Sequence, residues 1–169
     1  MRYRVDATVP WPVDAVHDVF RNRIQRLAAY ITGVESVTRI AADDGADRHR
    51  WVLSRDAMPS FVAPLLPDDA LGFEDCLRWN GHKAQFEVTP FQHADAVRFS
   101  GWVALHDDGL DTQVEVEGDF SLTESARARM PDLLGTRGID TLESAVTAQV
   151  RNHVRLACRA VDQLLDDEV

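Results

Sequence analysis

Three side chains have the chemistry of a general acid or base and lie where the sequence predicts an apolar strand face. Asp75 stands between Phe73 and Leu77 in an alternating stretch, so it shares their face and would be removed from water. A desolvated carboxylate suits proton transfer, or a polar anchor for a ligand. His49 and His82 fall on apolar faces by the same alternation. If the chain is an enzyme, these three residues are its candidate acid and base.

Each of these residues also has an ordinary structural interpretation. Asp75 is solvated if its strand begins later than the alternation indicates, and it is neutralised if an arginine pairs with it. A single histidine near a strand start is more often structural or exposed than functional. The sequence has no closely spaced histidine pair and no cysteine partner for one, so it predicts no metal site. Nucleotide-binding glycine loops and the serine elbow of hydrolases are also missing, and no cofactor is expected.

Aromatic side chains are predicted on the inward faces of neighbouring strands. Trp51, Trp79, Phe86 and Phe99 fall there by alternation. Aromatic walls with few polar groups suit a flat or greasy ligand, although a filled core has the same composition. Trp102 falls on the opposite, charged face. An outward tryptophan is typical of a protein contact, so a homodimer is one interpretation, and cover by a loop is the other.

Residues 57–67 read AMPSFVAPLLP and carry apolar side chains on an irregular segment. Its three prolines lack an N–H donor, so they exclude a regular helix and a central strand. Met58 and Phe61 belong to this segment. Two interpretations stay open: a lid at the mouth of a ligand cavity, or an ordinary packed connection between strands.

Periodicity predicts the elements that position these residues. The alternation of residues 2–9 indicates a half-buried strand, and helical spacing follows over 13–20 and 24–31. Long strand candidates then cover 34–42, 48–56, 73–79, 82–89, 96–106 and 112–122. A final helix is predicted over 139–165, with an apolar stripe that includes Val146 and Val150. An antiparallel sheet with helices on one face defines an α+β fold.

Two hairpins can be placed in register from the sequence. Asparagine and glycine at 80–81 are typical of a two-residue type I′ turn, which would place Asp75 opposite Phe86. In the next hairpin, opposite charges favour a register that places Gly101 opposite Val116. Glycine within a strand often marks a bend or the close approach of another part of the protein.

Composition and charge narrow the class of protein. The chain has 169 residues, 45% of them hydrophobic, and a formal net charge of −10. One domain, residues 1–169, can bury a substantial core at this length. The acidic balance argues against nucleic acid as a partner. The sequence contains no long uncharged apolar run, so it predicts no stable membrane insertion. Two isolated cysteines and an N-terminus unlike a signal peptide favour a cytoplasmic location.

The order of elements resembles the START-like, or SRPBCC, helix-grip superfamily over essentially the whole chain. The opening MRYRVDATVPWPVDAVHDVF is similar to the first strand and helix of that superfamily. The stretch MPSFVAPLLPDDALGFEDCLRWN, then KAQFEVTPF, then VEVEGDFSL before a long helix, looks like an uncharacterised bacterial branch. The resemblance implies a curved antiparallel sheet of about six or seven strands wrapped around a long C-terminal helix, with two short helices after the first strand. The superfamily includes lipid-transfer domains, plant hormone-binding proteins and polyketide cyclases, and it shares no catalytic signature.

The expected function is the sequestration or transfer of a small hydrophobic molecule, such as a lipid or a polyketide-like compound, in a cavity between sheet and helix. The predicted ligand-binding residues are Trp51, Asp75, Trp79, Phe86, Phe99, Val116, Val146 and Val150, with Met58 and Phe61 at the mouth. Two alternatives stay open. One is a polyketide cyclase, aromatase or dehydratase that uses the same cavity, and the other is an interaction module whose cavity is filled by its own side chains.

Overall fold

In the part of the chain that the structure describes, seven antiparallel strands form one curved sheet. The computed structural model describes residues 1–41, 44–57, 71–92, 94–129 and 131–169. The strands follow the order β1-β7-β6-β5-β4-β3-β2. The elements are β1 (Arg2–Val9), α1 (Val13–Asn22), the short 3-10 helix η1 (Ile24–Ala29), β2 (Val34–Ile40), β3 (Asp47–Leu53), the 3-10 turn η2 (Arg55–Ala57), β4 (Gly72–Asn80), β5 (Lys83–Pro90), β6 (Val97–Asp108), β7 (Asp111–Leu122), α2 (Glu124–Arg129) and α3 (Pro131–Asp166).

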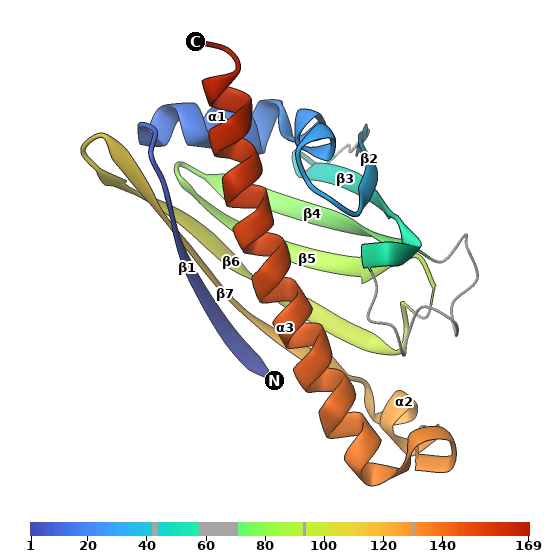
Figure 1. Cartoon of the computed structure of the whole chain (residues 1–169). Coiled ribbons are helices and arrows are strands. Elements are labelled where there is room, and N and C mark those ends of the chain that lie inside the picture. Colours follow the sequence, from blue (N-terminus) through green and yellow to red (C-terminus); the bar gives the residue numbers. More distant parts are fainter. Residues whose placement is uncertain (42–43, 58–70, 93, 130) are drawn as a thin grey trace.

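The long helix α3 crosses one face of the sheet, which curves around it (Figure 1). The predicted α+β helix-grip architecture is therefore confirmed, with α1 and η1 as the two short helices after the first strand. α3 begins at Pro131, earlier than the predicted start at residue 139, and the sequence analysis missed α2. The predicted stripe faces the sheet: Val161 and Leu164 are fully buried, and Val150 and Val154 pack against the same core.

The core is closed at the end where α1, β7 and the last turns of α3 meet. Val16 and Val19 of α1, Val114 of β7 and Val161 of α3 are at most 1% exposed. Polar contacts fix the same end. Trp11 Nε1 donates a hydrogen bond to Asp162 of α3 at 2.9 Å.

The C-terminal residues are also held at this end. Tyr30 donates a hydrogen bond to the Asp167 carboxylate at 2.8 Å, and Arg23 and Arg26 both pair with Glu168. The C-terminal end of α3 is therefore fixed to α1 and η1 by apolar and polar contacts together.

The β4-β5 hairpin turns at residues 81–82, one residue later than predicted. Gly81 has a φ of 59° at the first loop position, where two-residue hairpin turns need a positive φ that glycine adopts readily. Asp75 therefore lies opposite Val88 instead of Phe86, and the predicted register is wrong. The predicted register pairs Glu74 with Glu87 and Arg78 with Lys83, and the observed register avoids both like-charge pairs. Because each partner moves by two residues, every side chain that stays in the strands keeps its predicted face, whereas His82 moves into the turn.

The β6-β7 hairpin departs from prediction in the same way. Its two-residue loop, 109–110, begins with Gly109 at a φ of 79° and lets both strands run further toward the turn. Gly101 consequently lies opposite Gly118 instead of Val116. The predicted charge pairing between the strands was a weaker constraint than the geometry of the tight turn.

Gly101 and Gly118 lie opposite each other, and their missing side chains leave room for atoms of the neighbouring strands. A Cβ atom on Gly118 would lie 2.6 Å from the hydroxyl oxygen of Tyr3 in β1. A Cβ atom on Gly101 would lie 2.2 Å from the carbonyl oxygen of Glu117 and 2.8 Å from the ring of Phe86. All three distances are far below van der Waals contact, and the atoms concerned belong to neighbouring strands of the same sheet.

We expect Gly101→Ala to lower the free energy of unfolding by about 1–3 kcal/mol, because the added methyl group overpacks the sheet against backbone that cannot move away. Urea denaturation measures the change. Ser100→Ala, on the exposed side of the same strand, serves as the control and should stay within about 0.5 kcal/mol of wild type. Equal losses in the two variants would contradict the overpacking argument.

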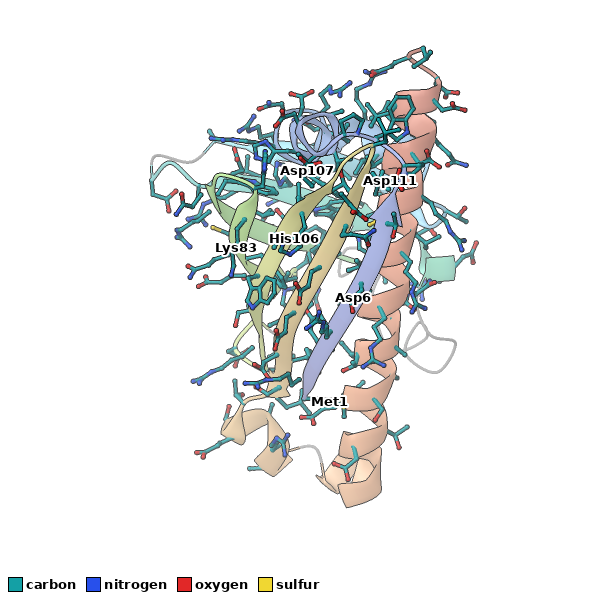
Figure 2. The ribbon with its side chains drawn as sticks, turned by 90° about the vertical axis from the view of Figure 1, so that its left-hand side faces the viewer. Met1, Asp6, Lys83, His106, Asp107 and Asp111 are labelled. Carbon is teal, nitrogen blue, oxygen red and sulfur yellow. The ribbon has the colours of Figure 1, made fainter. Side chains whose placement is uncertain are left out.

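The outer face of the sheet is strongly polar. Figure 2 shows this surface over β1, β7 and β6, with Asp6, Lys83 and His106 standing away from α3. Trp102 lies on this face as predicted, and the Lys83 ammonium covers its ring at 4.3 Å from the centroid. No helix among the described residues has the length and apolar character needed to cross a membrane.

Candidate ligand-binding site

The pairing of β3 with β4 brings the chemistry-bearing residues of the inner face together. His49 lies opposite Asp75, and Trp51 lies opposite Phe73. These four residues alternate with outward-facing neighbours, so their side chains all point to the side that α3 covers. Sequence reasoning placed His49, Trp51 and Asp75 on the inner face separately, and the strand register shows that they are neighbours.

Asp75 is bound by two side chains of β3. One carboxylate oxygen lies 2.8 Å from His49 Nδ1, and the other accepts a hydrogen bond from Trp51 Nε1 at 2.7 Å. The Asp75 side chain is 11% exposed and that of His49 is 1% exposed. Asp75 is therefore neither solvated nor paired with an arginine in the described structure, which answers the two structural alternatives raised from the sequence.

Asp75 determines which ring nitrogen of His49 carries the hydrogen. A carboxylate only accepts hydrogen bonds, so His49 carries its hydrogen on Nδ1 and exposes a lone pair on Nε2 when the ring is neutral. Within the described residues, this Nε2 atom is buried and has no hydrogen-bond partner. A buried polar atom without a partner is costly, so this atom is a candidate contact for a ligand.

His153 of α3 completes the cluster from the helix side. Its ring packs edge-on against Trp51, with centroids 5.2 Å apart, and against Phe73 at 5.9 Å. Burial lowers the pKa of His153 to about 4, and the negative charge of Asp75 opposes part of that shift. The ring is therefore neutral near pH 7, with one nitrogen able to donate and the other able to accept a hydrogen bond.

Sequence analysis did not identify His153 as a candidate. It follows Val150 by three residues and precedes Ala157 by four, so the helical spacing that defined the apolar stripe also includes it. Only apolar side chains were counted in that stripe. The spacing of His153 within the stripe was the signal that could have identified it.

Aromatic rings continue the inner surface across the sheet. Trp51 and Phe73 stack with planes 16° apart, and Phe99 of β6 makes edge-on contacts with Phe86 and Phe120. Tyr3 of β1 packs on Phe99 at 5.8 Å. Its hydroxyl has no partner among the described residues, and burial raises the pKa of Tyr3.

The inner surface of the central strand remains partly accessible. β5 has three strands on each side of it in the described sheet, yet its inward Phe86 is only partly buried. Phe73 and Phe99 on the sheet, and Val150 and His153 on α3, are partly buried as well. Because Phe86 lies far from both sheet edges, its accessible surface faces the space between the sheet and α3.

The remaining predicted wall residues divide into two groups. Val116 on β7 is buried in the main core, whereas Val146 on α3 packs against a second cluster formed by Phe120, Leu122 and Ala126. Trp79 lies inward as predicted, and its ring meets His17 of α1 edge-on at 4.9 Å. Met58 and Phe61, the predicted mouth residues, lie outside the described residues.

His82 does not join the cluster around Asp75. It occupies the β4-β5 turn instead of a strand face, because the turn falls at 81–82. Its Nε2 lies 3.0 Å from Asp14, and its ring meets that of His17 at 5.0 Å. The prediction that His82 lies on an apolar strand face is therefore wrong, and only His49 of the two histidines reaches Asp75.

A hollow of about 550 Å³ lies elsewhere, at one end of β3, β4 and β5. Arg50 and Glu74, which pair with each other on the outer face, contribute to its wall with Val52 and Phe91. It is therefore separate from the space next to Asp75. In the part of the chain that the structure describes, no group of three or more histidine, cysteine, aspartate or glutamate side chains is arranged to hold a metal ion.

Solved structures show which fold this architecture shares. The chain is similar to the Zhui aromatase/cyclase from Streptomyces sp. R1128, at 13% identity and a TM-score of 0.70 over 98% of this chain and 95% of that one. It is also similar to a START superfamily protein from Mycobacterium smegmatis, at 8% identity and 0.61 over 99% of each chain. The di-domain ARO/CYC BexL from the BE-7585A biosynthetic pathway matches at 14% and 0.69, over 96% of this chain and 49% of that chain. At these identities the likeness shows the fold, which is START-like.

The chain belongs to the family described as Protein of unknown function (DUF2505), whose model matches residues 4–123. No curated protein matches the chain in sequence. The matched range contains His49, Trp51 and Asp75 but ends before α3, so His153 lies beyond it. Assignment to a bacterial branch stays a prediction.

Proposed function

We propose that the chain binds a small hydrophobic molecule between the inner face of the sheet and α3, and that it sequesters or transfers this molecule. The partial exposure of Phe86 at the centre of the sheet carries the proposal. A ligand that covers this apolar side chain is stabilised by roughly 25 cal/mol for each Å² of apolar surface removed from water.

The proposed site has an aromatic wall and one polar corner. Trp51, Phe86 and Phe99 form the sheet side and Val146 and Val150 the helix side, while Asp75 orients the ligand. This division matches the usual character of small-molecule sites, which are mostly apolar with a few convergent polar groups. The ligand class named from the sequence, a lipid or a polyketide-like compound, fits such a site. A single domain, a cytoplasmic location and a homodimer stay predictions.

The proposal is tested by native mass spectrometry of the protein purified from its host, followed by organic extraction of any released compound. A hydrophobic compound bound at a stoichiometric ratio would support it. We expect Val150→Trp, which fills the space beside α3, to lose the bound compound, while Arg151→Trp, at an exposed position one residue on, retains it.

An empty protein that also shows no thermal shift with lipids or flat aromatic compounds would contradict the proposal. That result would favour an interaction module with a filled core. Loss of the compound from both tryptophan variants would also count against the site, because the change at Arg151 does not reach the inner face.

A further inference from the structure

We propose that the ligand is an uncharged ring compound with a hydroxyl group, that Asp75 accepts the hydrogen bond of this hydroxyl, and that the site disfavours carboxylates. The inference rests on the proposed binding function and names the class of ligand for the same site. It follows from the hydrogen-bonding capacity, the charge and the ring geometry around Asp75.

The hydrogen-bonding capacity around Asp75 is incompletely used. Each carboxylate oxygen receives one hydrogen bond, from His49 Nδ1 or Trp51 Nε1, and each can accept another. When the His49 ring is neutral, its Nε2 offers a further buried acceptor without a partner among the described residues. A group placed here must therefore donate a hydrogen bond, as a hydroxyl does.

His153 can supply the complementary contact. Its neutral ring offers one donor and one acceptor. A hydroxyl group donates one hydrogen bond and accepts others, so it can bind Asp75 and His153 together. A purely apolar ligand would leave these buried polar groups without partners, and desolvating them would weaken its binding.

Charge disfavours a carboxylate at the same place. The Asp75 carboxylate is largely buried, and two negative groups close together repel strongly where water is excluded. Arg39 pairs in register with His49, but its guanidinium binds Asp47. Arg21 also lies against Asp47, at 3.9 Å. Both guanidinium groups therefore lie against the single carboxylate of Asp47.

The ring geometry favours a flat molecule. Trp51 and Phe73 are stacked with centroids 5.7 Å apart and planes 16° from parallel, and His153 stands edge-on to both. Trp51 is buried, but Phe73 and His153 are only partly buried, and a flat ring system can pack on their accessible surface by stacking and edge contacts, which contribute beyond the area they bury. A flexible acyl chain gains less from this arrangement.

The test uses matched compounds on the protein freed of any bound compound. Isothermal titration calorimetry would compare naphthalene, 2-naphthol and 2-naphthoic acid, a second set built on phenanthrene, and the chain compounds dodecanol and dodecanoic acid. We expect the hydroxyl compound of a ring set to bind about 10- to 100-fold more tightly than its parent, as hydrogen bonds to a charged group usually allow. We expect the acid to bind no more tightly than the parent.

Asp75→Asn keeps the shape of the side chain and removes its charge. In this variant we expect the preference for hydroxyl over carboxylate to fall at least about tenfold, in line with the value of a hydrogen bond to a charged group. Glu74→Gln, the same change on the outer face of β4, should keep the preference of wild type.

The outcomes separate the inference from the function on which it rests. Ring compounds that bind equally well with and without the hydroxyl, tighter binding of the acids, or binding of the chain compounds alone would overturn the inference and leave the proposed function standing. Failure of every ring and chain compound to bind would overturn both. Because the first comparison uses wild type, a variant that does not fold cannot block the test.

Discussion

Replacing Asp75 by alanine is expected to lower the free energy of unfolding by about 2–4 kcal/mol. The substitution removes the acceptor of two donors, His49 Nδ1 and Trp51 Nε1, both on the covered side of β3. Leaving a buried donor without a partner costs about 1–3 kcal/mol for each group. Part of this loss is offset, because the folded protein no longer has to bury the carboxylate itself. Urea denaturation near pH 7 would measure the net effect.

Two comparisons show whether this loss comes from the hydrogen bonds that Asp75 accepts from His49 and Trp51. Glu74→Ala, the neighbouring change on the outer face, removes an exposed ion pair with Arg50 and should cost no more than about 1 kcal/mol. His49→Phe keeps a flat ring and removes the donor. In a double-mutant cycle we expect Asp75→Ala and His49→Phe together to cost at least about 1 kcal/mol less than the sum of the single changes. Additive losses would mean that the two residues do not stabilise one another.

The fold could be predicted from the sequence because its signals repeat along whole elements. Alternation over eight or more residues defines a strand face even when its ends are misplaced, and the stripe of α3 extends through many turns. The hairpin registers depended on single turns. At residues 80–82 the sequence Asn-Gly-His allows glycine to be the first or the second loop residue, and the local pattern does not decide between them.

The candidate site was predicted in its parts but not as a whole. Alternation placed Asp75, His49 and Trp51 on the inner face correctly. Their contacts depend on the pairing of β3 with β4, and the connection between these strands is too long to fix the register by a turn. His82 was misplaced because a shift of one residue in the turn removes it from the strand. His153 comes from an element distant in the sequence, and its neighbours follow from the way α3 crosses the sheet.

Stability is expected to rise with pH between about 4 and 6.5, and His153 accounts for a defined part of that rise. In the unfolded chain this histidine binds a proton below its ordinary pKa of 6.5, whereas burial lowers its folded pKa to about 4. Between these values the unfolded state binds more protons, so lowering the pH favours unfolding. Each pKa unit corresponds to 1.36 kcal/mol, which gives His153 a contribution of about 3 kcal/mol at most.

The groups that face His153 determine how this contribution is measured. Trp51 and Phe73 contact its ring and do not titrate in this range, while Asp75 is the nearby carboxylate that opposes the lowering of its pKa. His153→Phe keeps an aromatic ring on the same surface and removes the titrating group. We expect the stability difference between wild type and this variant to change in favour of wild type by up to about 3 kcal/mol from pH 4 to pH 7. Urea titrations at several pH values would measure it, and parallel pH profiles for the two proteins would show that His153 is not buried as a neutral ring.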